Sequence, residues 1–172
     1  AMIGAWKAGN SCLALDPTAP RDWIEQALAA HDAAVVVCDA ASSPLADPTH
    51  RRRVVIDEEW ESLETAPLET GRADENQLAA SIPGHVDGDP PMVRGLTHGM
   101  LLTSSAAAAE LLDFRPGDSF LVRSMPGGGA FFDEWLVPLL GGGTAHVAAE
   151  DLLESTTAPV THLRFTAPEW AN

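Results

Sequence analysis

Basic residues are scarce in this chain of 172 residues, which has 10 Lys and Arg against 25 Asp and Glu and a formal net charge of −15. Nucleic acids and anionic membranes bind proteins largely through cations, so this charge excludes both as partners. No apolar run reaches the roughly 18 residues of a membrane span, and the first residues do not have the pattern of a secretory leader. We therefore expect a cytoplasmic protein.

Cysteine is also rare, and the two thiols, Cys12 and Cys38, each lie in a short apolar run. Two cysteines cannot make a disulfide framework, so we expect reduced thiols in the core, with a bridge between them as the alternative. The histidines are too scattered for metal-ligand spacing, and we predict no metal site. They are His31, His50, His85, His98, His146 and His162.

No residue pattern for nucleophilic or acid–base catalysis is evident, so we predict no catalytic residue. Ser104 and Ser105 lack the G-x-S-x-G context of a hydrolase nucleophile. Asp133 and Glu134 are neighbours in a predicted helix and would not face each other. The glycine run 127–129 fits either an anion-binding nest or a flexible turn, and base rates favour the turn.

Apolar residues make up 45% of the chain, enough for a folded core. Short apolar runs alternate with helix-spaced segments, which predicts an α/β fold: a layered, mostly parallel sheet flanked by helices. We expect Pro20 to be the first residue of a helix and 34–38 to be a strand buried on both faces. Predicted strands cover 11–15, 34–38, 54–56, 77–82, 92–96, 119–123, 144–148 and 160–165, and predicted helices cover 2–9, 20–31, 97–112 and 130–140.

Five stretches in a characteristic order carry a family resemblance. They read AWKAGNSCLALDPTAP, then a helix with AVVVCD, GLTHGMLLTSSAAAAELLDFRPGDSFL, EWLVPLLGGGTAHVA and VTHLRFTAPEW. In this order they resemble the middle of an adenylation domain of nonribosomal peptide synthetases, within the adenylate-forming superfamily. The resemblance implies part of the large N-terminal lobe, as one adenylation-like subdomain over residues 1–172. The family's later elements, including the ribose-binding aspartate and the C-terminal catalytic lysine, have no match, so we expect a truncated domain.

The segment that corresponds to the family's phosphate loop is altered. Family members hold ATP phosphates with T-S-G-S-T-G-x-P-K-G, whereas this chain reads SIPGHVDGDPPM over residues 81–92. The degenerate positions are Gly84, His85, Gly88, Asp89 and Met92. The family's lysine falls on Pro91 or Met92, depending on where one extra residue is placed. The aspartates and prolines disfavour triphosphate, and we predict no bound cofactor.

The position of the substrate-binding aspartate is altered too. In amino-acid-activating members an aspartate binds the substrate ammonium, and counting back from Glu134 places it on Gly129. The alternative is a displaced motif at Phe132–Asp133, which requires a four-residue deletion. We favour Gly129, and on that alignment the aspartate is lost.

These features predict a catalytically silent adenylation-like domain with a structural or docking role in a peptide synthetase. Its partners would be neighbouring condensation, carrier or tailoring domains, and the sequence leaves a homodimer open. One alternative is an excised fragment of an active, divergent adenylating enzyme. Another is a module that binds an apolar ligand, because Ile82, Val86 and Met92 make the altered loop apolar.

Overall fold

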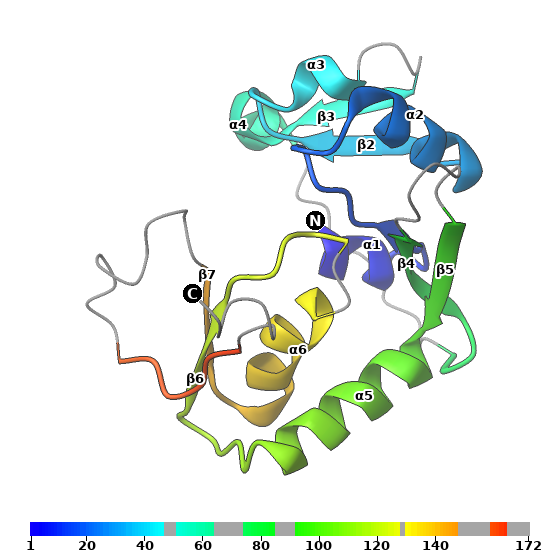
Figure 1. Cartoon of the computed structure of the whole chain (residues 1–172). Coiled ribbons are helices and arrows are strands. Elements are labelled where there is room, and N and C mark those ends of the chain that lie inside the picture. The colour runs from blue at the N-terminus through cyan, green and yellow to red at the C-terminus, as the bar shows by residue number, and fades with distance from the viewer. Residues whose placement is uncertain (47–50, 64–73, 85–91, 128–129, 148–158, 165–172) are drawn as a thin grey trace. The chain divides into compact units, whose positions relative to one another are not determined.

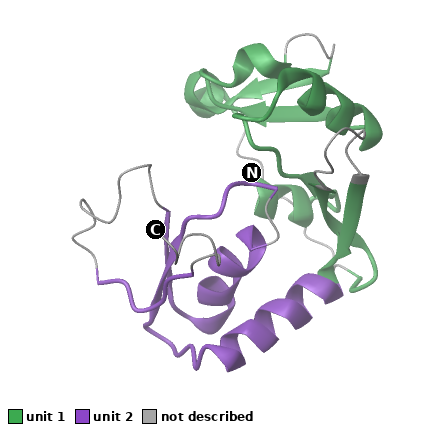
Figure 2. Ribbon diagram, in the orientation of Figure 1, with its two compact units in different colours: residues 1–98 green, residues 99–172 purple. Residues whose placement is uncertain are grey.

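The computed structural model describes residues 1–46, 51–63, 74–84, 92–127, 130–147 and 159–164. These form two compact units, residues 1–98 and residues 99–172 (Figure 2). Both units combine helices with small sheets, which confirms the predicted α/β class. The single adenylation-like subdomain over 1–172 stays a prediction.

Unit 1 contains two small sheets with short helices between their strands (Figure 1). One sheet has the order β1-β4-β5, in which β4 pairs parallel with β1 and antiparallel with β5. The other is the parallel pair β2-β3. The elements are α1 (Met2–Lys7), β1 (Cys12–Leu13), α2 (Arg21–Ala30), β2 (Val35–Cys38), α3 (Ser43–Ala46), β3 (Arg52–Val55), α4 (Ile56–Glu59), the 3-10 helix η2 (Trp60–Ser62), β4 (Leu78–Gly84) and β5 (Met92–Thr97).

Local signals place the first elements of unit 1. The helix α1 ends before Gly9, which has a φ of 75° that suits glycine. The helix predicted over 20–31 is confirmed as α2, and Ile24, Ala27 and Leu28 on one of its faces are buried. Pro20 is the N-cap residue rather than the first helical residue, so that prediction was wrong by one position. The extended conformation of an N-cap residue suits proline as well.

The strand β2 corrects a second prediction. Val35 and Val37 are 46% and 47% exposed, so β2 is not buried on both faces. Among the described residues the β2–β3 sheet has two strands. Burial alternates along β2, so the face that carries Val35 and Val37 is open. Cys12 and Cys38 are free thiols, but both are half-buried rather than part of the core.

Unit 2 contains a parallel pair of strands and a helix that packs against both of them. Its elements are α5 (His98–Leu111), which begins at the boundary between the units, β6 (Ser119–Val122), α6 (Phe131–Gly141) and β7 (Thr144–Val147). All four residues of β6 are buried. The helix α6 ends at Gly141, and its C-cap residue Gly142 has a φ of 74°, a left-handed conformation that favours glycine. A full strand over 160–165 was a wrong prediction, because 159–164 contribute only an isolated bridge from His162 to Phe120.

Candidate functional site

The frame of the altered phosphate loop is a β-hairpin in unit 1, whose register shifts once, between Leu78 and Ala80. The strands β4 and β5 pair in antiparallel register up to Gly84 opposite Met92. The predicted positions His85, Gly88 and Asp89 belong to 85–91, outside the described residues. Sequence analysis therefore located both strands that hold the loop, and the structure brings their ends, Gly84 and Met92, together.

A proline lies inside this frame, close to its tip. Pro83 is buried in β4 and pairs with Val93. The neighbouring strand β1 pairs with β4 only at Ala80 and Ser81. Pro83 therefore lies where β4 has a single neighbouring strand, a place where a residue without an N–H is tolerated. It also removes one backbone donor from the approach to the loop.

The base of the hairpin is fixed by contacts with the N-terminal segment. Trp6 Nε1 donates a hydrogen bond to the carbonyl oxygen of Ala79 at 2.7 Å, and Gln77 Nε2 donates to Gly9 O at 2.9 Å. The backbone N–H of His98 donates to Gln77 O at 3.0 Å. The His98 ring lies edge-on to Trp6, with centroids 5.8 Å apart. These contacts hold His98 and the start of β4 against α1 and the residues that follow it.

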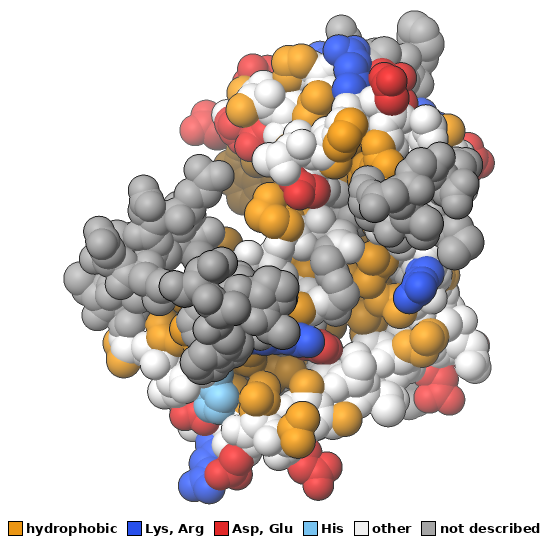
Figure 3. Space-filling view, viewed as in Figure 1, with side chains coloured by type: hydrophobic (Ala, Val, Ile, Leu, Met, Phe, Trp, Pro, Cys, Tyr) orange, Lys and Arg blue, Asp and Glu red, His pale blue; other side chains and the backbone are white. Residues whose placement is uncertain are grey.

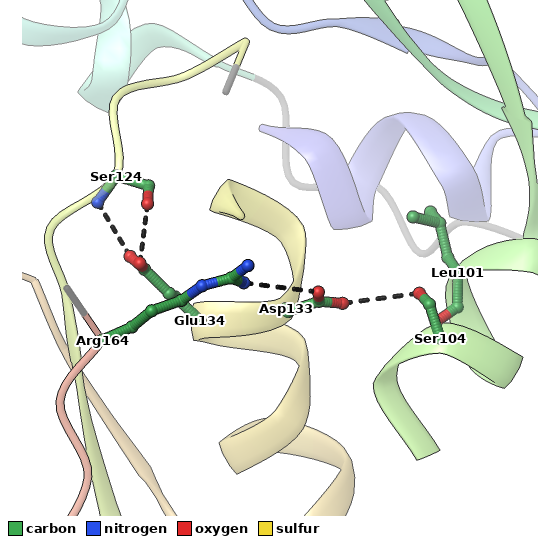
Figure 4. A network of polar contacts seen from close by, with 6 residues as sticks. All are labelled: Leu101, Ser104, Ser124, Asp133, Glu134 and Arg164. Atoms are coloured by element: carbon green, nitrogen blue, oxygen red, sulfur yellow. Dashed lines mark hydrogen bonds and ion pairs between the residues drawn. The ribbon is translucent and has the colours of Figure 1, made fainter. Parts of the chain in front are cut away.

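A second polar centre lies in unit 2, where β6 leads toward α6 (Figure 4). The Glu134 side chain is 2% exposed and takes three hydrogen bonds. Its Oε2 accepts from the N–H groups of Arg123 and Ser124, both at 2.8 Å, and its Oε1 accepts from Ser124 Oγ at 2.6 Å. Bonds of this kind to a carboxylate are strong, and they offset the cost of burying its charge.

Glu134 also lies in the first turn of α6, where the helix dipole favours a negative charge. The carboxylate ties the backbone after β6 to the first turn of the helix. Gly129, the predicted position of the lost substrate aspartate, lies outside the described residues. In the sequence Glu134 served only as an alignment position, and this clamp was not predicted. The available signal was an acidic residue in the first turn of a helix after a buried strand.

Asp133 points away from this clamp, as expected for neighbouring helical residues. Its Oδ2 lies 3.8 Å from Arg164 Nη1, and its Oδ1 lies 3.4 Å from Ser104 Oγ (Figure 4). The Asp133 side chain is 27% exposed and that of Arg164 is 51% exposed. The only carboxylate of the alternative Phe132–Asp133 motif is therefore already beside a cation. Phe132 itself is buried in the core of unit 2.

Other chemistries find little support in the described part of the chain. Burial raises the pKa of the Cys12 and Cys38 thiols, which disfavours the nucleophilic thiolate at either position. Within the described ranges, no three His, Cys, Asp or Glu side chains gather as a metal site. No helix among the described residues is long and apolar enough to cross a membrane.

Comparisons with known proteins give a likeness in structure alone. No family model and no curated protein matches the sequence. The chain superimposes on VinN over 85% of its own length and 39% of that chain, with a TM-score of 0.72 and 19% identity. For ATP-bound MatB from Rhodopseudomonas palustris the shares are 86% and 32%, with a TM-score of 0.72 and 16% identity.

A nonribosomal peptide synthetase, FmoA3, is matched over 85% of this chain and 15% of that one, with a TM-score of 0.70 and 21% identity. This chain thus spans less than half the length of each of these three structures. They are adenylate-forming enzymes, and the likeness covers nearly all of this chain. The chain therefore has the fold of part of the N-terminal lobe of adenylate-forming enzymes.

Proposed function

We propose that this chain is a catalytically silent adenylation-like domain with a structural or docking role in a nonribosomal peptide synthetase. One observation carries the proposal: the β4–β5 frame is intact up to Gly84 and Met92, but the loop between them has no lysine and no hydroxyl. A chain required only to fold would keep such a frame and lose the residues that bind phosphate.

The electrostatics of the loop support this proposal. Asp87 and Asp89 place two negative charges in the segment that would hold triphosphate. Each charge repels a phosphate charge about 4 Å away by about 1 to 4 kcal/mol, depending on how watery the surroundings are. Pro90 and Pro91 provide no N–H groups, and backbone N–H groups are the main ligands of phosphate loops.

The substrate side supports the same conclusion. If the family's aspartate corresponds to Gly129, its carboxylate is gone. If it corresponds to Asp133, the carboxylate already faces Arg164 and Ser104. An incoming substrate ammonium would have to displace the guanidinium. On both alignments, an amino acid would lack the free carboxylate that binds its ammonium group.

A silent domain still has surfaces, and we infer that these hold neighbouring synthetase domains of the condensation, carrier or tailoring type. The likeness to a nonribosomal peptide synthetase fits this context. A homodimer is the other assembly to test. Native mass spectrometry of the purified chain shows whether it forms a homodimer by itself.

Isothermal titration of the chain with Mg·ATP and with L-aspartate tests the proposal, because a related fold has been solved with L-aspartate. We expect no binding of either ligand and no pyrophosphate exchange. Micromolar ATP binding or measurable exchange would reject the proposal.

A matched pair of variants tests the electrostatic cause. Asp87→Asn with Asp89→Asn should raise the affinity for tripolyphosphate. Glu75→Gln with Glu110→Gln removes the same charge from exposed positions elsewhere and should leave it unchanged. Equal effects in both pairs would mean that only net charge matters.

The second candidate is a fragment of an active, divergent adenylating enzyme whose nucleotide groups lie in other parts of a longer polypeptide. It is favoured by the coverage, since about two thirds of ATP-bound MatB has no counterpart here. The parent polypeptide should then contain a tyrosine-glycine nucleotide motif and a terminal lysine. The parent polypeptide should also bind ATP, whereas this chain alone should not.

A further inference from the structure

We propose that Trp60 is the apolar anchor of a docking face on unit 1 and that this face takes a cationic, amphipathic helix of a partner protein. We call it the Trp60 face and define it as α4 and η2, Ile56–Ser62. This inference rests on the proposed function, because a scaffolding domain needs a surface that holds a neighbour.

The exposure of Trp60 is the first observation. Its side chain is 67% exposed, although most large apolar groups of unit 1 are at least half covered. Among the described residues, no hydrogen bond or ring contact involves it. Tryptophan is the residue most enriched at binding hot spots, because it buries a large rigid area at little entropic cost. An indole left in water on a short helix is therefore a candidate anchor.

The charges around this indole determine the chemistry of the partner. Glu58 and Glu61 flank it in sequence and are exposed, and neither has a partner in the described part of the chain. Figure 3 shows acidic side chains gathered at the end of unit 1 where α4 lies in Figure 1. An apolar ring between exposed carboxylates complements an arginine, whose guanidinium stacks on the ring while the carboxylates bind its N–H groups.

The other two acidic residues hold this face in place. Asp57 Oδ2 accepts a hydrogen bond from the N–H of Ala40 at 3.1 Å, and Glu59 Oε1 accepts from the N–H of Val55 at 2.9 Å. These bonds tie α4 to β3 and to the segment after β2. Two carboxylates thus position the helical turns, while the side chains of Glu58 and Glu61 make no hydrogen bond or ion pair with the described residues. A pre-positioned anchor lowers the entropic cost of binding.

The test uses the full chain and two synthetic amphipathic helical peptides with identical leucine positions, one rich in arginine and one rich in glutamate. Calorimetry should show binding of the arginine-rich peptide only. Amide chemical shifts should change at residues 56–63. Trp60→Ala should weaken binding at least ten-fold, about 1.4 kcal/mol. Glu58→Gln with Glu61→Gln should weaken it and reduce its dependence on salt.

Leu111→Ala is the matched control, because Leu111 is an exposed apolar residue of unit 2. It should bind the peptide as the unchanged chain does. Circular dichroism should show that all variants are folded, as substitutions of exposed side chains rarely destabilise. Three results would each overturn the inference: no binding of the arginine-rich peptide, undiminished binding by Trp60→Ala, or equal binding of the glutamate-rich peptide. The second result would mean that the peptide responds only to net charge.

A failure of the Trp60 face and a failure of the proposed function give different results. Nucleotide binding in the calorimetry described above would refute catalytic silence and leave the Trp60 face untouched. A negative peptide result with no nucleotide binding would refute the Trp60 face and leave the silent domain without an assigned docking surface.

Discussion

Removal of the Glu134 carboxylate should destabilise unit 2 far more than removal of its neighbour. Glu134→Ala leaves the N–H groups of Arg123 and Ser124 without their acceptor, and it leaves the Ser124 hydroxyl without its partner. A buried polar group left unpaired costs about 1 to 3 kcal/mol. Because these donors are only partly buried, we expect about 3 to 5 kcal/mol in total.

Glu134→Gln separates the hydrogen bonds from the charge. The amide oxygen can accept from both backbone N–H groups, while the amide nitrogen donates to Ser124 Oγ, which also accepts. Only the charge contribution is lost, and relief from burying a charge offsets part of it. We therefore expect a loss of about 1 kcal/mol or less.

Asp133→Ala is the matched control for this series. Asp133 lies in the same first turn of α6, so the helix-dipole contributions are alike. Its contacts with Arg164 and Ser104 are long and partly exposed, and such contacts contribute about 0 to 1 kcal/mol. Urea unfolding measures all three variants, and hydrogen exchange at the amides of residues 123 and 124 localises the effect. A Glu134→Ala loss no larger than that of Asp133→Ala would refute the clamp, as would a Glu134→Gln loss equal to that of Glu134→Ala.

Two further predictions concern packing and pH. Gly143→Ala should destabilise by about 1 to 3 kcal/mol, because its Cβ would collide with Asp118 O and the Phe114 ring. Gly4→Ala, in an open position of α1, should instead stabilise by about 0.5 to 1 kcal/mol. The midpoints of urea unfolding measure both changes. A Gly143→Ala variant as stable as the unchanged chain would contradict the close contact. Burial lowers the pKa of His31, so the unfolded chain binds its proton more readily. Stability should therefore fall as pH drops below about 6.5, the ordinary pKa of imidazole. The urea midpoint of His31→Gln should fall less over that range than the midpoint of the unchanged chain. Equal falls in the two midpoints would contradict the role of His31.

Some of this fold could be predicted because its signals are local. Gly9 and Gly142 end their helices through positive φ values that favour glycine, and the sequence shows this directly. The spacing of Ile24, Ala27 and Leu28 indicates one buried helix face without knowledge of what covers it. The two strands around the altered loop were likewise predicted from their composition and their order.

Other features depend on neighbours that are distant in sequence. A run such as Val35–Val37 is compatible with a strand covered on both faces or on one, and only the elements that pack against each face of the sheet distinguish these cases. The last segment is apolar enough for a strand, but it pairs with β6 through a single bridge at His162. Which strands pair, and which of their faces are buried, depends on the assembled structure, so composition alone predicts both poorly.

By itself, the sequence determined the α/β class, the order of elements that resembles adenylation domains, and the loss of lysine and hydroxyls from the phosphate loop. Each depends on residue identity and local spacing, which the printed chain contains in full. Only the tertiary structure decided that Glu134 clamps the backbone after β6, that Asp133 faces Arg164, and that Trp60 remains exposed. These depend on which groups meet after folding, because hydrogen bonds and burial act over a few ångströms in space, however far apart the residues lie in the chain.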